Sequence, residues 1–356
     1  MSGAAGFVWD PRLASHVYRE DHPLKPWRLR GVYDTLERLG AFARPGARVL
    51  APRDATPAEI LRIHDPAYVD AIVQASAQPD LAYSEWGLAK WGDTPPFKGM
   101  HEASLLTTGA SVVAMEEVIA GRARVAFNGA GGLHHAMRRR ASGFCIYNDP
   151  AIVCGILADR GMKVAYVDID AHHGDGVQAA FYETDQVLSI SLHETGRTLF
   201  PGTGFADERG TGKGAGYSVN VALPPYTDDP AYVRAFDAVV PPLVERFRPD
   251  VLVTQQGIDP HFADPLTHLQ LSTHARHHVV RWFASTPYPW VAMGGGGYDL
   301  DAVRRTWSME YLLMLGAPIP PELHDQRPPE LRGSARTAVD GATDEAVGEA
   351  LAAAFR

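Results

Sequence analysis

The segment Tyr166–Gly176 constrains the fold and the function of this chain more than any other. It crowds three aspartates and two histidines into the end of an apolar run. Lys163 to Val167 is mostly apolar and partly β-branched, as in a strand buried on both faces, and Gly174 and Gly176 mark the turn that ends it. Because buried acids without partners are costly, the segment predicts a binding site at the carboxyl end of a strand.

Strand side chains alternate between two faces, which places Asp168, Asp170 and His172 on the same side. A carboxylate and an imidazole two residues apart suit zinc, which accepts both kinds of ligand at about 2.0–2.2 Å. The alternative is that the acids cap the following helix. This accounts for one of them, Asp175, ahead of a helix at Val177–Phe181. The remaining acids favour a metal site.

Strands and helices alternate along the chain, a pattern that predicts a parallel sheet covered by helices on both faces. The predicted strands are Phe7–Asp10, Arg48–Ala51, Arg124–Asn128, Lys163–Asp168, Val187–Leu192, Ser218–Leu223, Val251–Gln255 and Trp290–Met293. The main predicted helices are Pro26–Leu39, Pro57–Ile63, Pro66–Ala75, Ala103–Ile119, Pro150–Arg160, Pro230–Phe247, Thr273–Phe283, Leu300–Leu315 and a peripheral or partly frayed Asp344–Phe355. Ligands bind beyond the carboxyl ends of such strands, so the loops there should converge on one pocket.

Composition narrows the class of protein. The 356 residues contain no apolar run near the roughly 18 residues that a membrane span needs. The net charge of −9 argues against a nucleic-acid binder and is compatible with a cationic substrate. Cys145 and Cys154 have no zinc-ribbon or redox spacing, so we expect reduced thiols in a cytoplasmic protein. No linker divides the chain, so we expect one domain at residues 1–320 and a C-terminal extension at 321–356 that packs on it or frays.

Three further motifs follow predicted strands. His134 and His135 come after a glycine-rich turn, and a carboxylate partner would hold such an imidazole in one tautomer and raise its basicity. Asp259 either caps a turn before Pro260 or supplies the third ligand of an open zinc site. Four glycines precede Tyr298 without the lysine of a phosphate-binding loop, and a tyrosine held there can donate its hydroxyl to a developing oxyanion.

Together these motifs resemble the zinc-dependent histone deacetylase family over roughly Pro23 to Leu315. The resemblance is carried by Gly131–His135, Ser142–Asp149, Asp168–Gly176, Phe200–Gly204 and Gly294–Tyr298 in this order, and Asp259–His268 is similar to the bacterial acetoin-utilisation deacetylases. It implies an arginase/deacetylase-like three-layer α/β fold with a central, mostly parallel eight-stranded sheet. It also implies an enzyme that removes acetyl groups from Nε-acetyl-lysine in proteins and releases acetate.

The resemblance also implies a role for each site residue. Asp170, His172 and Asp259 would bind one catalytic Zn²⁺ and activate a water molecule. His135, paired with Asp175, would be the general base; His134, paired with Asp168, would stabilise charge; and Tyr298 would polarise the substrate carbonyl. The residues expected to contact substrate are Asp93 at the rim, Gly143 through its carbonyl, Phe144 and Phe200 as tunnel walls, and Leu266 near the mouth. A structural K⁺ is expected near the backbone of Asp168–His172 and Ser191–Leu192.

Three other functions remain open from the sequence. An acetylpolyamine amidohydrolase would use similar chemistry, although an acid at the position of Leu266 would suit its substrate better. An arginase-like ureohydrolase with two manganese ions would need a second acid where this chain has Gly257. A non-catalytic binding module would need neither the histidine pair nor Tyr298. The physiological substrate, the preferred acyl chain, the resting metal and the oligomeric state are not fixed by the sequence.

Overall fold

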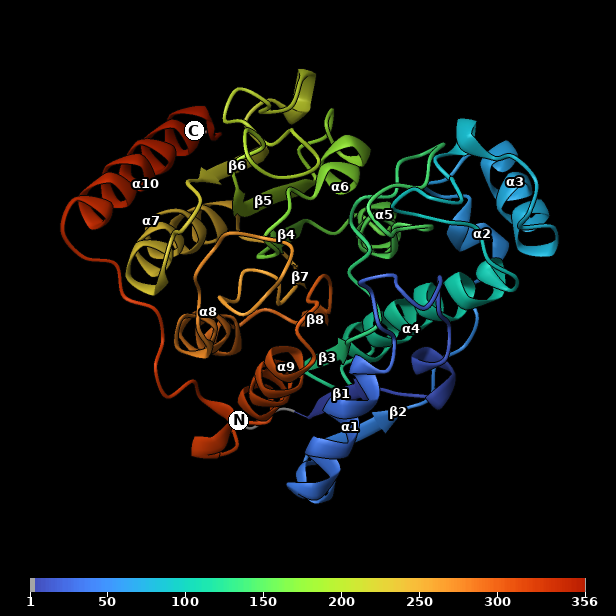
Figure 1. The fold of residues 1–356 in the computed structure, drawn as a ribbon, viewed down its shortest axis with the longest axis horizontal. Coiled ribbons are helices and arrows are strands. Elements are labelled where there is room, and N and C mark those ends of the chain that lie inside the picture. Colours follow the sequence, from blue (N-terminus) through green and yellow to red (C-terminus); the bar gives the residue numbers. More distant parts are fainter. Residues whose placement is uncertain (1–3, 356) are drawn as a thin grey trace.

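Eight parallel strands form one sheet through the centre of the molecule (Figure 1). The computed structural model describes residues 4–355. The strands are β1 (Ala5–Val8), β2 (Ala47–Leu50), β3 (Val125–Asn128), β4 (Val164–Asp168), β5 (Val187–Glu194), β6 (Ser218–Leu223), β7 (Val251–Gln255) and β8 (Trp290–Met293). Their order across the sheet is β2-β1-β3-β8-β7-β4-β5-β6. The predicted α/β class and eight-stranded sheet are confirmed, with every strand pair parallel.

Helices cover both faces of the sheet, as parallel connections require. They are α1 (Arg28–Arg38), α2 (Pro57–Ile60), α3 (Pro66–Ala77), α4 (Met100–Ile119), α5 (Asp149–Asp159), α6 (Asp175–Ala180), α7 (Asp229–Phe247), α8 (Thr273–Ser285), α9 (Leu300–Met314) and α10 (Gly333–Ala353). In Figure 1, α1, α9, α8 and α7 lie on one side of the sheet, and α4, α5 and α6 lie on the other. Because both faces are covered, β3, β4, β5, β7 and β8 are buried along their whole length.

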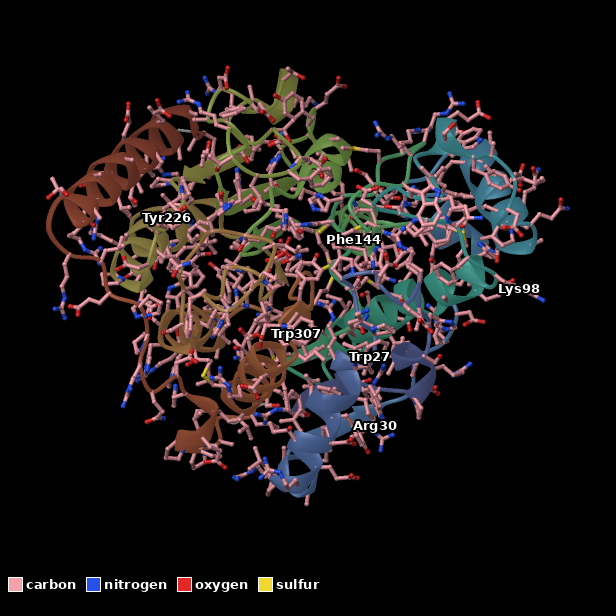
Figure 2. All side chains as sticks on the ribbon, in the orientation of Figure 1. Trp27, Arg30, Lys98, Phe144, Tyr226 and Trp307 are labelled. Atoms are coloured by element: carbon pink, nitrogen blue, oxygen red, sulfur yellow. The ribbon has the colours of Figure 1, made fainter. Side chains whose placement is uncertain are left out.

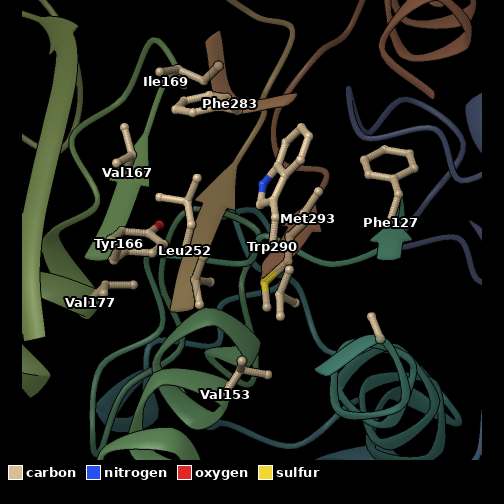
Figure 3. Close-up of a cluster of buried hydrophobic side chains, with 14 of the residues drawn as sticks. Phe127, Val153, Tyr166, Val167, Ile169, Val177, Leu252, Phe283, Trp290 and Met293 are labelled. Atoms are coloured by element: carbon tan, nitrogen blue, oxygen red, sulfur yellow. The ribbon is translucent and has the colours of Figure 1, made fainter. Parts of the chain in front are cut away.

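The core consists of apolar side chains that pack on both sides of the central strands (Figure 3). Leu252 and Trp290 lie on the neighbouring strands β7 and β8, with Phe283 of α8 on one side and Val153 of α5 on the other. The buried indole of Trp290 donates to Thr254 Oγ1 at 2.8 Å, which satisfies its polar atom. The continuous apolar runs seen in the sequence are therefore the buried strands of this core.

The strand order explains why distant loops meet. β4 pairs with β7, β7 with β8, and β8 with β3, so the loops that follow these four strands start side by side at one edge of the sheet. These are the loops that carry the histidine pair, the acidic cluster, Asp259 and the four glycines. The topology therefore brings the sequence motifs to a single place.

The C-terminal segment differs from its prediction. Its helix α10 begins at Gly333 rather than at Asp344, and it packs on α7 and β6. Glycines inside the helix lower its intrinsic propensity, so the local sequence hides its start. Packing and ion pairs stabilise it instead, including Arg336 with the buried Asp228. The domain boundary near residue 320 stays a prediction.

A buried ion pair joins α8 to α9. Arg276 Nε donates to Glu310 Oε1 at 2.9 Å, and both side chains are almost fully buried. We expect Arg276→Met to lower the free energy of unfolding by about 3–5 kcal/mol, because it leaves Glu310 buried without its partner. Urea unfolding measures this loss. The exposed Arg234–Asp340 pair is the matched control, where Arg234→Met should cost less than about 1 kcal/mol. Equal losses in the two variants would contradict the prediction.

Candidate active site

A pocket of about 300 Å³ opens at the carboxyl edge of the sheet, and most of the predicted site residues line it. Those that line it are Asp93, His134, His135, Gly143, Phe144, Asp170, His172, Phe200, Leu266 and Tyr298. Phe144 lies near the middle of the molecule in the view of Figure 2. The remaining predicted residues, Asp168, Asp175 and Asp259, are buried and each contacts a residue that lines the pocket. The structure thus brings the whole predicted set together.

Asp170, His172 and Asp259 form a candidate metal site. One ligand atom from each lies within 4.8 Å of the others, and all three side chains are buried. His172 Nδ1 lies 3.1 Å from Asp170 Oδ1 and 2.9 Å from Asp259 Oδ2. Asp170 and His172 come from the loop after β4, and Asp259 comes from the loop after the neighbouring strand β7. Two carboxylates and one imidazole are a ligand set that zinc accepts.

The surroundings of this cluster fit a cation. Asp170 Oδ2 accepts hydrogen bonds from Gln255 Nε2 at 2.6 Å and from the Gly296 amide at 2.9 Å, which leaves Oδ1 facing His172. Burial and the neighbouring Asp170 raise the pKa of Asp259 to about 6. Two carboxylates share this buried space, so a bound cation would offset charge that water cannot reach.

Two glycines let the backbone approach the carboxylates. A Cβ added at Gly257 would lie 1.9 Å from Asp170 Oδ2, and one added at Gly296 would lie 2.0 Å from Asp259 Oδ2. Any side chain at these positions would push a carboxylate out of place. The position of Gly257 therefore has no room for a second acidic ligand.

The two adjacent histidines each contact a different aspartate. His134 Nδ1 lies 2.7 Å from Asp168 Oδ2, His135 Nδ1 lies 2.7 Å from Asp175 Oδ1, and the two Nε2 atoms are 3.0 Å apart. Although burial opposes it, the carboxylates of Asp168 and Asp170 raise the pKa of His134 to about 9. Burial and the charge of His134 lower the pKa of His135. At neutral pH the proton of this pair therefore resides on His134, whose Nε2–H points at the Nε2 of the neutral His135, and His135 is the better base of the two.

Tyr298 follows a glycine loop whose carbonyls accept hydrogen bonds from Arg28. Gly295 and Gly297 have φ values of 147° and 128°, which only glycine adopts readily. The buried Arg28 guanidinium donates to Gly297 O at 2.7 Å and to Gly295 O at 2.6 Å. Burial and the nearby Asp259 raise the pKa of Tyr298 well above its ordinary value, so its hydroxyl keeps its proton. The tyrosine is thus a hydrogen-bond donor at the pocket.

The pocket walls are aromatic. Phe144 has a left-handed backbone conformation with a φ of 67°. Two hydrogen bonds hold it: Tyr18 Oη donates to the Phe144 carbonyl at 2.6 Å, and the Phe144 amide donates to Thr94 Oγ1 at 3.1 Å. Asp93 accepts from the Gly143 amide at 3.0 Å. Phe200 is 42% exposed, which places it at the open end. The rim acid therefore also fixes the loop that carries one aromatic wall.

Several contacts at the site were not predicted from the sequence. Arg28, Gln255 and Asp264 each hold a residue of the site through a long-range hydrogen bond, and no local pattern marks them. The helix-capping alternative for Asp175 is wrong in detail, because Asp175 is the first residue of α6 and Gly174 occupies the cap position. His261 is buried, and its Nε2 lies 3.0 Å from Asp325 Oδ2.

Two carboxylates and one imidazole form a buried cluster at the carboxyl edge of a parallel sheet, beside a histidine pair and a tyrosine. This arrangement defines an α/β protein with a candidate metal-dependent active site. A family model described as "Histone deacetylase domain" matches residues 22–314. The chain therefore belongs to the histone deacetylase domain family.

Individual relatives agree with this assignment. Acetoin utilization protein AcuC of Bacillus subtilis is 39% identical over 329 residues, which cover 89% of this chain and 84% of that protein. AcuC of Staphylococcus xylosus is 37% identical over 327 residues, with 89% and 84% covered. A crystal structure of an HDAC homolog complexed with SAHA has a TM-score of 0.85 at 30% identity, covering 97% of this chain and 100% of that one. The predicted family and its acetoin-utilisation branch are both confirmed.

Within residues 4–355, no helix combines the length and apolar character that a membrane crossing requires.

Proposed function

We propose that this chain is a zinc-dependent amidohydrolase that removes acetyl groups from Nε-acetyl-lysine in proteins or peptides and releases acetate. The observation that carries the proposal is the convergence of the three candidate metal ligands, the neutral His135 and the protonated Tyr298 on one narrow pocket. Membership of the histone deacetylase domain family supports the same reaction.

The proposed roles follow from the chemistry of each side chain. A zinc ion bound by Asp170, His172 and Asp259 would act as a Lewis acid on the acyl carbonyl and would favour ionisation of water. His135 would accept a proton from the attacking water at Nε2 once the water replaces the His134 contact at that atom, while Asp175 holds its Nδ1–H. The Tyr298 hydroxyl donates a hydrogen bond to the acyl oxygen as charge develops there.

The second half of the reaction returns that proton. The C–N bond breaks as His135 donates its proton to the departing lysine amine, and the water oxygen remains on the acyl carbon as acetate. The charged His134, paired with Asp168, stabilises the negative charge that collects in the pocket. The products are acetate and a free lysine side chain, so atoms and charge balance without a further reactant.

The pocket suits an acyl-lysine chain. Phe144 and Phe200 line the pocket and would supply apolar walls for the lysine methylenes, and the Gly143 carbonyl would accept from the substrate amide. Asp93 lies at the rim, where its carboxylate would accept from the substrate backbone. Leu266 is 38% exposed and contributes no charge to the mouth. The position of Leu266 therefore offers no acid to the second amine of a free polyamine, and this favours a lysine side chain as substrate.

Substrate class is tested by comparing steady-state deacetylation of an acetyl-lysine peptide and an acetylated polyamine by zinc-loaded protein. We expect the peptide to have the higher kcat/KM. A higher value for the polyamine would assign the chain to small-molecule amide hydrolysis instead. No turnover of either substrate by folded, metal-loaded protein would favour the binding-module alternative.

The ureohydrolase alternative loses support at Gly257. A second metal there would need an acid, and the Asp170 carboxylate already fills the space of a side chain. The structural K⁺ that the family resemblance implies stays a prediction.

The rate should depend on pH through His135. Because burial and the charge of His134 lower its pKa from 6.5, kcat/KM should stay high at neutral pH and fall only below about pH 6.5, as the base takes up a proton. His134→Asn removes the neighbouring positive charge, so it should move this acid limb to higher pH. A pH–rate profile of both proteins measures the shift. An unchanged acid limb in the variant would contradict the assignment of His135 as base.

A further inference from the structure

We propose that Asp264, braced by Asp325 from the C-terminal segment, is a positioning residue for Tyr298. The inference rests on the proposed role of Tyr298, and it concerns how the chain holds that hydroxyl in place. Asp264 lies outside the candidate metal ligands and does not line the pocket.

Asp264 joins two residues that line the pocket. Its Oδ2 accepts from the Tyr298 amide at 2.8 Å, and its Oδ1 accepts from the Leu266 amide at 2.9 Å. The side chain is 9% exposed, so these bonds form away from bulk water. One carboxylate therefore fixes the backbone of the tyrosine and that of a residue at the rim.

The tyrosine loop needs such support because four glycines precede it and supply no side-chain packing. Arg28 binds the carbonyl of Gly297 on one side of the tyrosine, and Asp299 caps α9 on the other, with Oδ1 accepting from the Ala302 amide at 2.7 Å. Asp264 binds the amide of Tyr298 between them. The three contacts together fix the direction in which the tyrosine side chain leaves the backbone.

The loop that carries Asp264 is itself anchored by the C-terminal segment. The Asp264 amide donates to His261 O at 2.8 Å, and the His261 ring contacts Asp325 Oδ2 through Nε2 at 3.0 Å. His261 Nδ1 accepts from the Ala263 amide at 3.1 Å, so Nε2 carries the proton and donates to Asp325. This ring is buried.

Asp325 also ties this loop to the helix that follows Tyr298. Arg305 of α9 contacts Asp325 Oδ1 at 2.9 Å, and the Thr273 amide of α8 donates to Oδ2 at 2.9 Å. A residue beyond position 320 thus connects α8, α9 and the 259–266 loop. The C-terminal segment contributes to the geometry of the site in addition to covering α7.

A double-mutant comparison tests the proposal. In the full-length, zinc-loaded protein, Asp264→Ala should lower kcat on an acetyl-lysine peptide on the order of 10- to 100-fold, with a much smaller change in KM, because small misplacements of a reacting group are costly. In protein that already carries Tyr298→Phe, the same substitution should lower the remaining kcat less than about twofold, because no hydroxyl is left to misplace. Asp325→Ala should lower kcat by a smaller factor, and this fall should likewise be nearly absent in protein that carries Tyr298→Phe.

Equal loss of kcat in both backgrounds would overturn the proposal, because Asp264 would then act on the metal ligands or on general stability. If the alanine variant does not fold, Asp264→Asn replaces it in the test, because asparagine retains one acceptor oxygen. The fall in kcat caused by Asp264→Asn should also disappear in protein that already carries Tyr298→Phe. Asp250→Ala is the matched control, since its Oδ2 accepts from the Lys163 amide at 2.7 Å, at the end of β4 opposite the site. It should lower the melting temperature and leave kcat unchanged.

Failure of the proposed function gives a different result. If Tyr298→Phe alone retains full kcat, the tyrosine is not the oxyanion donor, whatever Asp264 does. If Tyr298→Phe loses activity but Asp264→Ala does not, the proposed function stands and the positioning role is wrong.

Discussion

Tyr298→Phe is expected to lower kcat about 100- to 1000-fold while changing KM little, which is the usual effect of removing one oxyanion donor. The phenylalanine keeps the ring and its contact with Phe144, so packing and substrate binding are preserved. The hydroxyl is the lost group, and its raised pKa means that it is protonated and donating in the native protein.

Steady-state kinetics on an acetyl-lysine peptide measure this effect. Tyr226→Phe is the control, because Tyr226 is 55% exposed and lies apart from Phe144 in Figure 2. An equal fall in kcat/KM caused mainly by a higher KM would indicate that Tyr298 binds substrate and does not stabilise the transition state.

Removal of the metal by a chelator should abolish deacetylation, with a loss of at least about 100-fold, and Zn²⁺ should restore it. Asp259→Ala should have the same effect without rescue, because one of three ligands is then missing. Metal content measured on the purified proteins gives a readout independent of activity. We expect one tightly bound ion in the native chain and a strongly reduced content in the variant.

Thermal unfolding offers a second check on the metal site. An ion that binds the folded chain raises its melting temperature, so Zn²⁺ should stabilise the stripped native protein and not the Asp259→Ala variant. Asp237→Ala, at an exposed surface pair with His278, is the control and should behave like the native chain. Activity that persists in protein shown to be free of metal would contradict the proposed function.

The parts of this structure that were predictable from sequence are those in which local pattern and global packing agree. Apolar runs such as Val251–Gln255 are buried strands, and the polar clusters that follow them had to meet because parallel strands end at one edge. The candidate metal ligands follow from this rule. The pairing of His134 with Asp168 and of His135 with Asp175 was expected from the family resemblance, and both contacts are present.

The unpredicted residues are those whose contacts depend on the tertiary fold. Arg28 lies near the start of the first long helix, yet it binds carbonyls of Gly295 and Gly297. Asp264 lies in the loop after Asp259 and Asp325 lies beyond residue 320, and neither position has a sequence pattern that points to Tyr298. Their importance comes from burial and hydrogen bonding, which the sequence does not encode locally.

The start of α10 was missed for a related reason. Intrinsic propensity favours a helix only in the alanine-rich part, whereas the first turns are stabilised by Arg336 with Asp228 and by packing on α7. Tertiary contacts therefore extend a helix that local propensity would end.

Hydrolysis by this chain is tested by product analysis with protein shown to hold one metal ion per chain. Incubation with an acetyl-lysine peptide should release acetate and free lysine side chains in equal amounts. This release should stop after chelation, and it should be lost in both His135→Ala and Tyr298→Phe. Metal-loaded, folded protein that binds the peptide but releases no acetate would contradict the proposed function, because the site would then recognise acetyl-lysine without hydrolysing it.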